Sequence, residues 1–394
     1  MLAAILRGDA DGLHALGGPD CAACATLAVH HGLGPCLYLR ARRMADAWPL
    51  PAEVERELRT SYLGATLENG AFMAGAARAV ERLAAAGVPV AALKGLHLAS
   101  AVYEHPALRR LSDLDLLVPS DRLEAARAAL LADGYRPSGV DDPTLHHVAP
   151  LVKKGVAPIE LHRDICPDPN PFRIDVAPLW ERMVPTTVGG QPALGLCAED
   201  LVLHLCVHMV FNHRCLVPLR NVLDVAEVVA GDGVRWDRLE EAARATGTRR
   251  AVFCGLALAR DMFGAAVPAD VLARLAPAGD AAEALRTARE NVLDHASAGP
   301  MWMGITLAES DPTRRLRGLW GRVFAPPDRL LETSGRRAGV AELAWIYATR
   351  PFKLLVRHRH RLAALLRGRA EEAAELRVAR AGAALDAWVS APDP

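Results

Sequence analysis

Two aspartates interrupt a stretch of the chain that otherwise has the composition of a buried strand. Asp113 and Asp115 lie within the segment LRRLSDLDLLV. An isolated ionised carboxylate is costly to bury, and two neighbouring carboxylates also repel each other. A strand with this sequence therefore needs a cation beside it, unless both acids are solvated at a surface end of the strand.

Side chains alternate between the two faces of a strand, so Asp113 and Asp115 share one face while Leu114 and Leu116 share the other. Two carboxylates in this arrangement present oxygen atoms to a single point. Oxygen ligands suit a hard divalent cation such as Mg²⁺ (or Mn²⁺), which often uses one or two carboxylates together with substrate phosphates. The aspartate pair therefore predicts a metal site.

A third carboxylate follows the same alternation in the segment APIELHRDI, where Glu160 and His162 share a face. If this strand lies beside the first, Glu160 joins the two aspartates. Three such acids can hold two metal ions, one at a triphosphate and one at an attacking hydroxyl. The alternatives are an ion pair of Glu160 with Arg163 or Lys154, and a purely structural role for His162.

The segment ALKGLHLAS offers a phosphate site, because a strand that ends at Lys94-Gly95 is followed by a helix. Glycine permits close backbone approach, and a helix N-terminus presents free N–H groups to an anion. Lys94 would add a positive charge, or would pair with an aspartate instead. Arg109 and Arg110 directly precede the acidic strand and are placed to reach phosphates.

Hydrophobic periodicity divides the rest of the chain into elements. Helices are expected up to a stop at Gly87, followed by strand, helix, strand, helix and a hairpin that turns at Lys153-Lys154-Gly155. Asp121 and Glu124 have capping-box spacing at the start of the second of these helices. Helical periodicity returns after about residue 188. At 394 residues the chain suggests more than one domain, and the predicted regions are 1–87 (helical), 88–187 (mixed α/β core), 188–310 (helical) and 311–394 (basic and helical).

The charge of the chain is balanced overall but not locally. Lys and Arg number 46, as do Asp and Glu, which argues against a generic polyanion binder. Arginines concentrate between Arg314 and Arg369, and RPFKLLVRHRHRLAALLRGR predicts a basic amphipathic helix that packs on the body or contacts a membrane surface or nucleic acid. The absence of a secretory signal or an uncharged membrane-length run, with eight scattered cysteines, predicts a cytoplasmic protein with reduced thiols.

Three histidines gather in the segment HLCVHMVFNH. His204 and His208 are four residues apart on one helical face, with His213 nearby. That spacing can bind zinc, but no HExxH pattern accompanies it. We favour a structural role, or a polar wall of a cleft, over a zinc site.

Taken in order, LKG, LRRLSDLDLLV and IELH resemble the nucleotidyltransferase superfamily of the DNA polymerase β type, and more closely a bacterial family of uncharacterised nucleotidyltransferases. The similarity continues into the flanking segments ENGAFMAGAARAVERLAAAG, LCAEDLVLHLCVHMVFNH and YATRPFKLL. It implies an α+β fold with a small mixed-sheet nucleotidyltransferase core between N-terminal and C-terminal helical regions. The wider superfamily has Gly-Ser or Gly-Gly at the strand–helix turn, whereas this chain has Lys94-Gly95 followed by Leu96.

The resemblance implies a Mg²⁺- or Mn²⁺-dependent enzyme that moves a nucleoside monophosphate from an NTP such as ATP to a hydroxyl-bearing acceptor, with release of pyrophosphate. The acceptor would be a small molecule, a peptide or protein, or RNA, and zero net charge disfavours a long nucleic acid. The alternative is a non-catalytic protein that retains the fold and binds a nucleotide or a partner. The residues expected to act are Asp113, Asp115 and Glu160 in catalysis and metal binding, Lys94, Gly95, Arg109, Arg110 and Ser112 in nucleotide binding, and His162, His208 and Asp224 in an acceptor pocket.

Overall fold

A computed structural model describes most of the first three quarters of the chain and one helix near its end. The described residues are 6, 18–44, 50–139, 141, 145–167, 170–231, 233–279, 281–294, 347, 349 and 370–391. The basic helix expected in RPFKLLVRHRHRLAALLRGR lies outside the described residues, as does most of the predicted region 311–394.

A seven-stranded mixed sheet forms the centre of the fold, with strand order β3-β4-β5-β2-β1-β7-β6. The strands are β1 Ala91–Ala92, β2 Leu114–Leu117, β3 Arg136–Pro137, β4 Leu151–Val152, β5 Ile159–His162, β6 Val184–Val188 and β7 Gln191–Gly195. β2 runs parallel to β5 and β1 runs parallel to β7, whereas the other neighbours are antiparallel. The predicted α+β class with a mixed sheet flanked by helices is confirmed.

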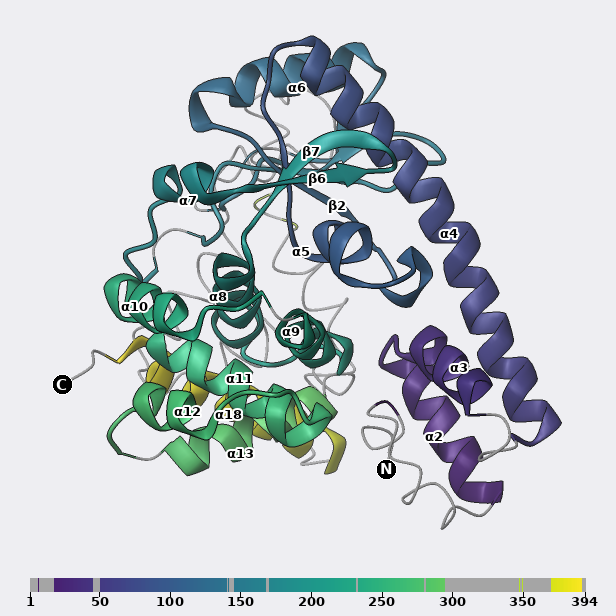
Figure 1. Ribbon diagram of the computed structural model, residues 1–394, viewed down its shortest axis with the longest axis vertical. Helices are drawn as coiled ribbons and strands as arrows, with labels where there is room; N and C mark the ends of the chain where they lie inside the picture. Colours follow the sequence, from purple (N-terminus) through teal and green to yellow (C-terminus); the bar gives the residue numbers. More distant parts are fainter. Residues whose placement is uncertain are drawn as a thin grey trace.

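One face of the sheet is covered by two helices, α4 (Ala52–Ala85) and α6 (Leu123–Ala132) (Figure 1). α4 ends where predicted, since Gly87 has a φ of +68° that favours glycine. The apolar core under these helices contains Ala76, Ala79, Val80, Leu83, Leu114, Leu116, Leu130, Ile159 and Leu161. Leu114 and Leu116 therefore face α4, as the alternation along the strand predicts. The opposite face of β2 is the one that carries Asp115.

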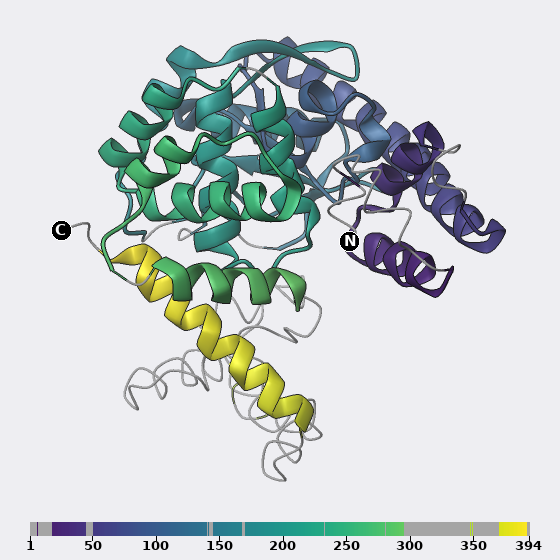
Figure 2. The ribbon, with the colours of Figure 1, turned by 60° about the horizontal axis from the view of Figure 1, so that its bottom comes forward.

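Helical layers lie beyond the other face of the sheet and at the far end of α4. Figure 1 shows α2 and α3 beside the N-terminal half of α4, and a group of helices from α8 onward below the sheet. In Figure 2, α18 crosses α13 at an angle and packs against it. The bounds are α2 Gly18–His30, α3 Gly34–Arg43, α5 Lys94–His97, α7 Ala177–Arg182, α8 Ala198–Val207, α9 Arg220–Ala230, α10 Trp236–Thr246, α11 Arg249–Phe263, α12 Ala269–Leu275, α13 Ala281–Leu293 and α18 Ala370–Ser390. Single π-helical turns follow α5 at Leu98–Val102 and α8 at His208–Asn212, and 3₁₀ turns occupy Pro106–Leu108 and Ser120–Arg122.

The hairpin formed by β6 and β7 departs from the sequence-based expectation of helix after about residue 188. β7 joins the sheet beside β1, with Ala91 paired to Leu194. The turn is made by Gly189 and Gly190, both at positive φ (+55° and +85°), and two glycines between strands are a known hairpin signal. The signal was present in TTVGGQPALG, but the short strands and Pro192 obscured it.

The predicted start of α6 differs in the structure. The prediction of a capping box is wrong, because Asp121 lies in the 3₁₀ turn before α6 and no side chain caps the start of that helix. Asp121 pairs instead with Arg122 at 3.6 Å.

All eight cysteines are free. Among the helices that the structure describes, none combines the length and the apolar character needed to span a bilayer.

Candidate active site

The parallel pairing of β2 with β5 brings two predicted acids together. Asp115 and Glu160 are direct partners in the register of the two strands, so their side chains emerge on the same face. Asp115, Glu160 and His162 each offer one ligand atom, and these atoms lie within 4.8 Å of one another. The expectation that two separate segments place carboxylates at one point therefore matches this geometry.

Asp115 is an ionised carboxylate held by two partners. Its Oδ1 lies 2.7 Å from Nζ of Lys94 and 2.7 Å from Nε2 of His162. Burial alone would raise the pKa of Asp115, but Lys94 and His162 outweigh burial and hold it well below its usual range. Lys94 thus adopts the aspartate pairing that the sequence left open, and His162, which is fully buried, supports the acid from within the sheet.

Asp113 stands just before β2 and faces the same cavity. Its Oδ1 accepts a hydrogen bond of 3.1 Å from Oγ of Ser112. Burial, together with the charges of Asp115 and Glu160, raises the pKa of Asp113. This crowding of negative charge is the electrostatic condition that the sequence indicated, and it favours a bound cation.

The turn at Lys94-Gly95 combines an unusual backbone conformation with tight packing. Lys94 has a φ of +43°, an unusual conformation for a residue other than glycine, and such strain clusters at functional sites at a cost of about 1–3 kcal/mol. A Cβ on Gly95 would lie 3.3 Å from Leu111 and 3.4 Å from Arg109. Glycine at this position therefore lets Leu111 and Arg109 pack closely against the turn.

Arg109 and Arg110 have different environments. The buried Arg109 donates from Nε to both oxygens of Asp224, at 2.7 and 2.9 Å, and the Tyr103 hydroxyl donates to the same carboxylate at 2.9 Å. Arg110 pairs with Glu68 at the surface, at 2.9 Å. Asp224 neutralises Arg109 rather than facing a pocket, and Arg110 does not line the cavity.

A cavity of about 580 Å³ lies over these groups, within the range of small-molecule sites. The predicted residues that line it are Lys94, Gly95, Arg109, Ser112, Asp113, Asp115, Glu160 and His208. Arg110, His162 and Asp224 are outside its lining. The nucleotide and acceptor roles assigned to all of these residues stay predictions, because the geometry alone does not test them.

The helical region supplies a wall that the sequence did not single out. Asn212 ends the π-helical turn after α8, and Arg220 and Asn221 begin α9; all three line the cavity. No hydrogen bond satisfies the buried amide atoms of Asn212, Oδ1 of Asn221 or Nε of Arg220. Hydrophobic periodicity in the sequence could not predict that these residues share a cavity wall. A connecting segment separates Asn212 from Arg220 and Asn221, and only the packing of the helices brings them together.

Histidines line much of the remaining surface. His146 and His147, which lie in the arm of the expected hairpin, have ring centroids 4.9 and 5.2 Å from that of His162. Nε2 of His208 lies 3.3 Å from Nε2 of His213. Burial lowers the pKa of His204 to about 3 and that of His213 to about 4, so both are neutral. Within the described residues, Asp115, Glu160 and His162 alone have metal-ligand spacing, so a zinc site at His204 and His208 gains no support.

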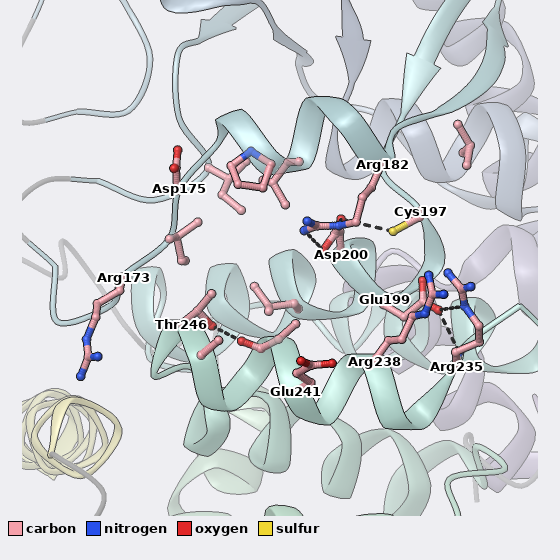
Figure 3. A pocket seen from close by; sticks show the side chains of 18 residues that line it. Arg173, Asp175, Arg182, Cys197, Glu199, Asp200, Arg235, Arg238, Glu241 and Thr246 are labelled. Atoms are coloured by element: carbon pink, nitrogen blue, oxygen red, sulfur yellow. Dashed lines mark hydrogen bonds and ion pairs between the residues drawn. The ribbon is translucent and has the colours of Figure 1, made fainter.

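A second cavity, of about 570 Å³, lies between α7, α8 and α10 (Figure 3). Arg182 donates to Asp200 at 3.0 Å and Arg235 donates to Glu199 at 2.8 Å. Two acid–base pairs in its lining therefore satisfy one another. It contains none of the predicted site residues, which leaves the acid-lined cavity as the candidate active site.

The donor set of the acid-lined cavity fits a hard divalent cation. Asp113, Asp115 and Glu160 supply carboxylate oxygens, the ligands that Mg²⁺ and Mn²⁺ prefer, and burial, followed by the charges of Asp115 and Glu160, raises the pKa of Asp113. A nearby imidazole is also compatible with Mn²⁺. Asp115 and Glu160, with His162 beside them, have the spacing of metal ligands, and a metal-binding role for Asp113 stays a prediction.

Comparison with known proteins agrees with this picture at the level of the family. A family model described as uncharacterised nucleotidyltransferase matches residues 18–264, more than half of the chain. The matched range includes the sheet, the acid-lined cavity and the helical wall around it. No curated protein and no solved structure matches the chain. The chain belongs to the family of uncharacterised nucleotidyltransferases.

Proposed function

We propose that the protein is a Mg²⁺- or Mn²⁺-dependent enzyme of the DNA polymerase β superfamily that transfers a nucleoside monophosphate from an NTP to a hydroxyl-bearing acceptor. The observation that carries the proposal is the pairing of Asp115 with Glu160 on the parallel strands β2 and β5. Both acids line one cavity together with Asp113 and the Lys94-Gly95 turn. Family membership supports the same chemistry.

In this proposal the acceptor oxygen forms a bond to the α-phosphorus while the bond from that phosphorus to the bridging oxygen breaks, and pyrophosphate leaves. The neighbouring His162 lowers the pKa of Glu160, so Glu160 is ionised but weakly basic. It would take the hydroxyl proton only where a bound metal makes that hydroxyl more acidic. Asp113, Asp115 and Glu160 would hold the metal. When bound, the metal would neutralise phosphate charge and activate the hydroxyl.

Other residues keep the acids in position. His162 and Lys94 fix Asp115 through its Oδ1, and Ser112 holds Asp113. Gly95 lines the cavity beside these groups. The wall containing His208 offers polar contacts to an acceptor, and the modest cavity volume of about 580 Å³ favours a small molecule or a peptide side chain over a long nucleic acid.

The test is a transfer assay with each α-labelled NTP and Mg²⁺ or Mn²⁺, in the presence and absence of cell extract. Label should appear on a discrete product with the wild-type chain and disappear with Asp115→Asn. The matched control is Asp121→Asn, because Asp121 is an exposed aspartate that lies outside the cavity. Equal labelling by wild type and Asp115→Asn, or none with any nucleotide and extract, would contradict the proposal.

One observation favours a second candidate function, in which the protein binds a nucleotide or a partner without catalysis. Lys94 already neutralises Asp115 at 2.7 Å, and the turn has Lys94-Gly95 where the wider superfamily has Gly-Ser or Gly-Gly. Biological activity and nucleotide binding that survive Asp113→Asn would favour this candidate. Loss of activity with binding retained would favour the enzyme.

A further inference from the structure

We propose that Arg220, together with the side-chain amide of Asn212, binds the pyrophosphate portion of the donor nucleotide; the inference rests on the proposed function and adds to it the residues that recognise the triphosphate. Both residues come from the helical region, whereas Asp113, Asp115 and Glu160 come from the sheet side of the same cavity. The cavity therefore has an acidic wall for metal and a separate wall for an anion.

Several polar atoms of this second wall lack hydrogen-bond partners. Nε of Arg220 and both polar atoms of the Asn212 amide are buried without a hydrogen bond. Buried polar groups are almost always satisfied, so several unsatisfied atoms on one cavity wall point to a ligand. The guanidinium of Arg220 and the amide N–H of Asn212 are donors, and their natural partner is an oxyanion with several acceptor oxygens; Oδ1 of Asn212 is an acceptor and would not contact the anion.

The other cations near the cavity are already committed. Lys94 pairs with Asp115 at 2.7 Å, and Arg109 pairs with Asp224 at 2.7 Å. Within the described residues, no carboxylate lies at ion-pair distance from Arg220. Burial and repulsion from Arg109 lower the pKa of Arg220 to about 10, which still leaves it charged at neutral pH. A bound anion would offset both effects.

The stem of Arg220 is held by the loop between α2 and α3. A Cβ on Gly32 would lie 3.0 Å from Cδ and 3.1 Å from Nη1 of Arg220. The backbone N–H of Leu219, one residue earlier, donates to Nδ1 of His31 at 3.1 Å. Packing thus directs this arginine, as expected of a binding residue and not of a freely solvated side chain.

The position of the anion follows from charge balance. The acidic wall, with metal, would hold the reacting α-phosphate, so the terminal phosphates need another cation. Arg220 supplies one, and its planar fork matches phosphate oxygens. A nucleoside monophosphate lacks the terminal phosphates and should not depend on Arg220. An anionic group on an acceptor has similar chemistry, and the binding experiment separates the two sources.

The experiment measures equilibrium binding of Mg²⁺-pyrophosphate, each Mg²⁺-NTP and each NMP to the full chain. Arg220→Gln should weaken pyrophosphate and NTP binding by about 10- to 100-fold, the usual effect of losing charge-assisted hydrogen bonds, and leave NMP binding unchanged. Arg238→Gln is the matched control, because Arg238 lines the second cavity of nearly equal volume (Figure 3). Asn212→Asp, which adds a negative charge at the same wall, should also abolish pyrophosphate binding and decides the matter if Arg220→Gln does not fold.

The outcomes separate the two proposals. If wild type binds pyrophosphate and NTP but Arg220→Gln or a folded Asn212→Asp binds them equally well, the inference is overturned and the proposed function stands. Equal loss of NMP and NTP binding in Arg220→Gln also overturns it, as does loss in Arg238→Gln alone. If wild type binds neither pyrophosphate nor any NTP, both proposals fail.

Discussion

The ammonium group of Lys94 lies 2.7 Å from Oδ1 of Asp115, so the chain neutralises its own most deeply buried site carboxylate. Only 12% of the Lys94 side chain and 3% of the Asp115 side chain are exposed. The cation that the acidic strand requires is thus present within the fold itself. A divalent ion that binds the same carboxylate would share it with Lys94 or displace the lysine.

Replacement of Lys94 by methionine should destabilise the fold and increase its response to metal. Removal of one partner of a buried ion pair costs about 3–5 kcal/mol. Chemical denaturation should show a loss of about 3 kcal/mol without metal, and Mn²⁺ should restore more stability to the variant than it adds to wild type. Lys153→Met is the control, because Lys153 pairs with Asp133 at 2.7 Å in a more solvated setting. Equal effects of the two substitutions would contradict the prediction.

Removal of single carboxylates should weaken metal binding. Loss of an outer partner of a metal ligand already costs about 10- to 100-fold in affinity, so Asp113→Asn and Glu160→Gln should cost at least as much. Titration of free Mn²⁺ by electron paramagnetic resonance measures the affinity. Glu241→Gln serves as the control, because Glu241 lines the second cavity. Wild-type Mn²⁺ affinity in both site variants would exclude this metal site.

Asp224 should matter more for stability than for acceptor contact. Its carboxylate is completely buried and accepts from both Arg109 and Tyr103. Asp224→Asn leaves the Arg109 charge unpaired and should lower the free energy of unfolding by about 3 kcal/mol. Tyr103→Phe removes one neutral donor and should cost about 1 kcal/mol. A wild-type unfolding midpoint for Asp224→Asn would show that the pairing contributes nothing.

The sequence predicts those parts of the site that depend on neighbouring residues in the chain, and it does not predict contacts between segments that are far apart in the chain. Strand alternation correctly assigned Leu114 and Leu116 to one face of the sheet, and the pairing of β2 with β5 then brought Glu160 to Asp115. Those inferences need only local periodicity and one strand pairing. Arg220 and Asn212 meet in the cavity through packing of the helical region, which periodicity does not encode.

Arg109 shows a different limit of sequence-based prediction. Its position next to the acidic strand suggested a phosphate contact, yet its counterion is Asp224, 115 residues away in the chain. Proximity in sequence identified a cationic group but not its counterion. The β6–β7 hairpin illustrates a third limit, because its Gly189-Gly190 turn was visible but short strands carry weak periodicity.

Stability should also depend on pH through Glu240 in the helical region. Hydrogen bonding from Arg274, at 2.7 Å from its Nη2 to Oε1 of Glu240, lowers the pKa of Glu240. A group whose pKa is lower in the folded state contributes stability above its unfolded value and loses it as pH falls through the folded value. Unfolding of wild type and Glu240→Gln, measured from about pH 7 to about pH 3, should show a large difference at neutral pH that shrinks in acid. A constant difference would contradict the assignment.

The contact of Gly32 with Arg220 gives a test that leaves the arginine itself intact. Gly32 and Gly87 have nearly equal φ values of +72° and +68°, so alanine at either position should incur a similar backbone strain of about 1–2 kcal/mol. Only at Gly32 would the added Cβ meet a side chain, since the corresponding space at Gly87 is open within 4 Å. Gly32→Ala should therefore weaken pyrophosphate binding, whereas Gly87→Ala should lose comparable stability and bind as wild type. Equal pyrophosphate affinity in the two variants would mean that the loop before α3 does not position Arg220.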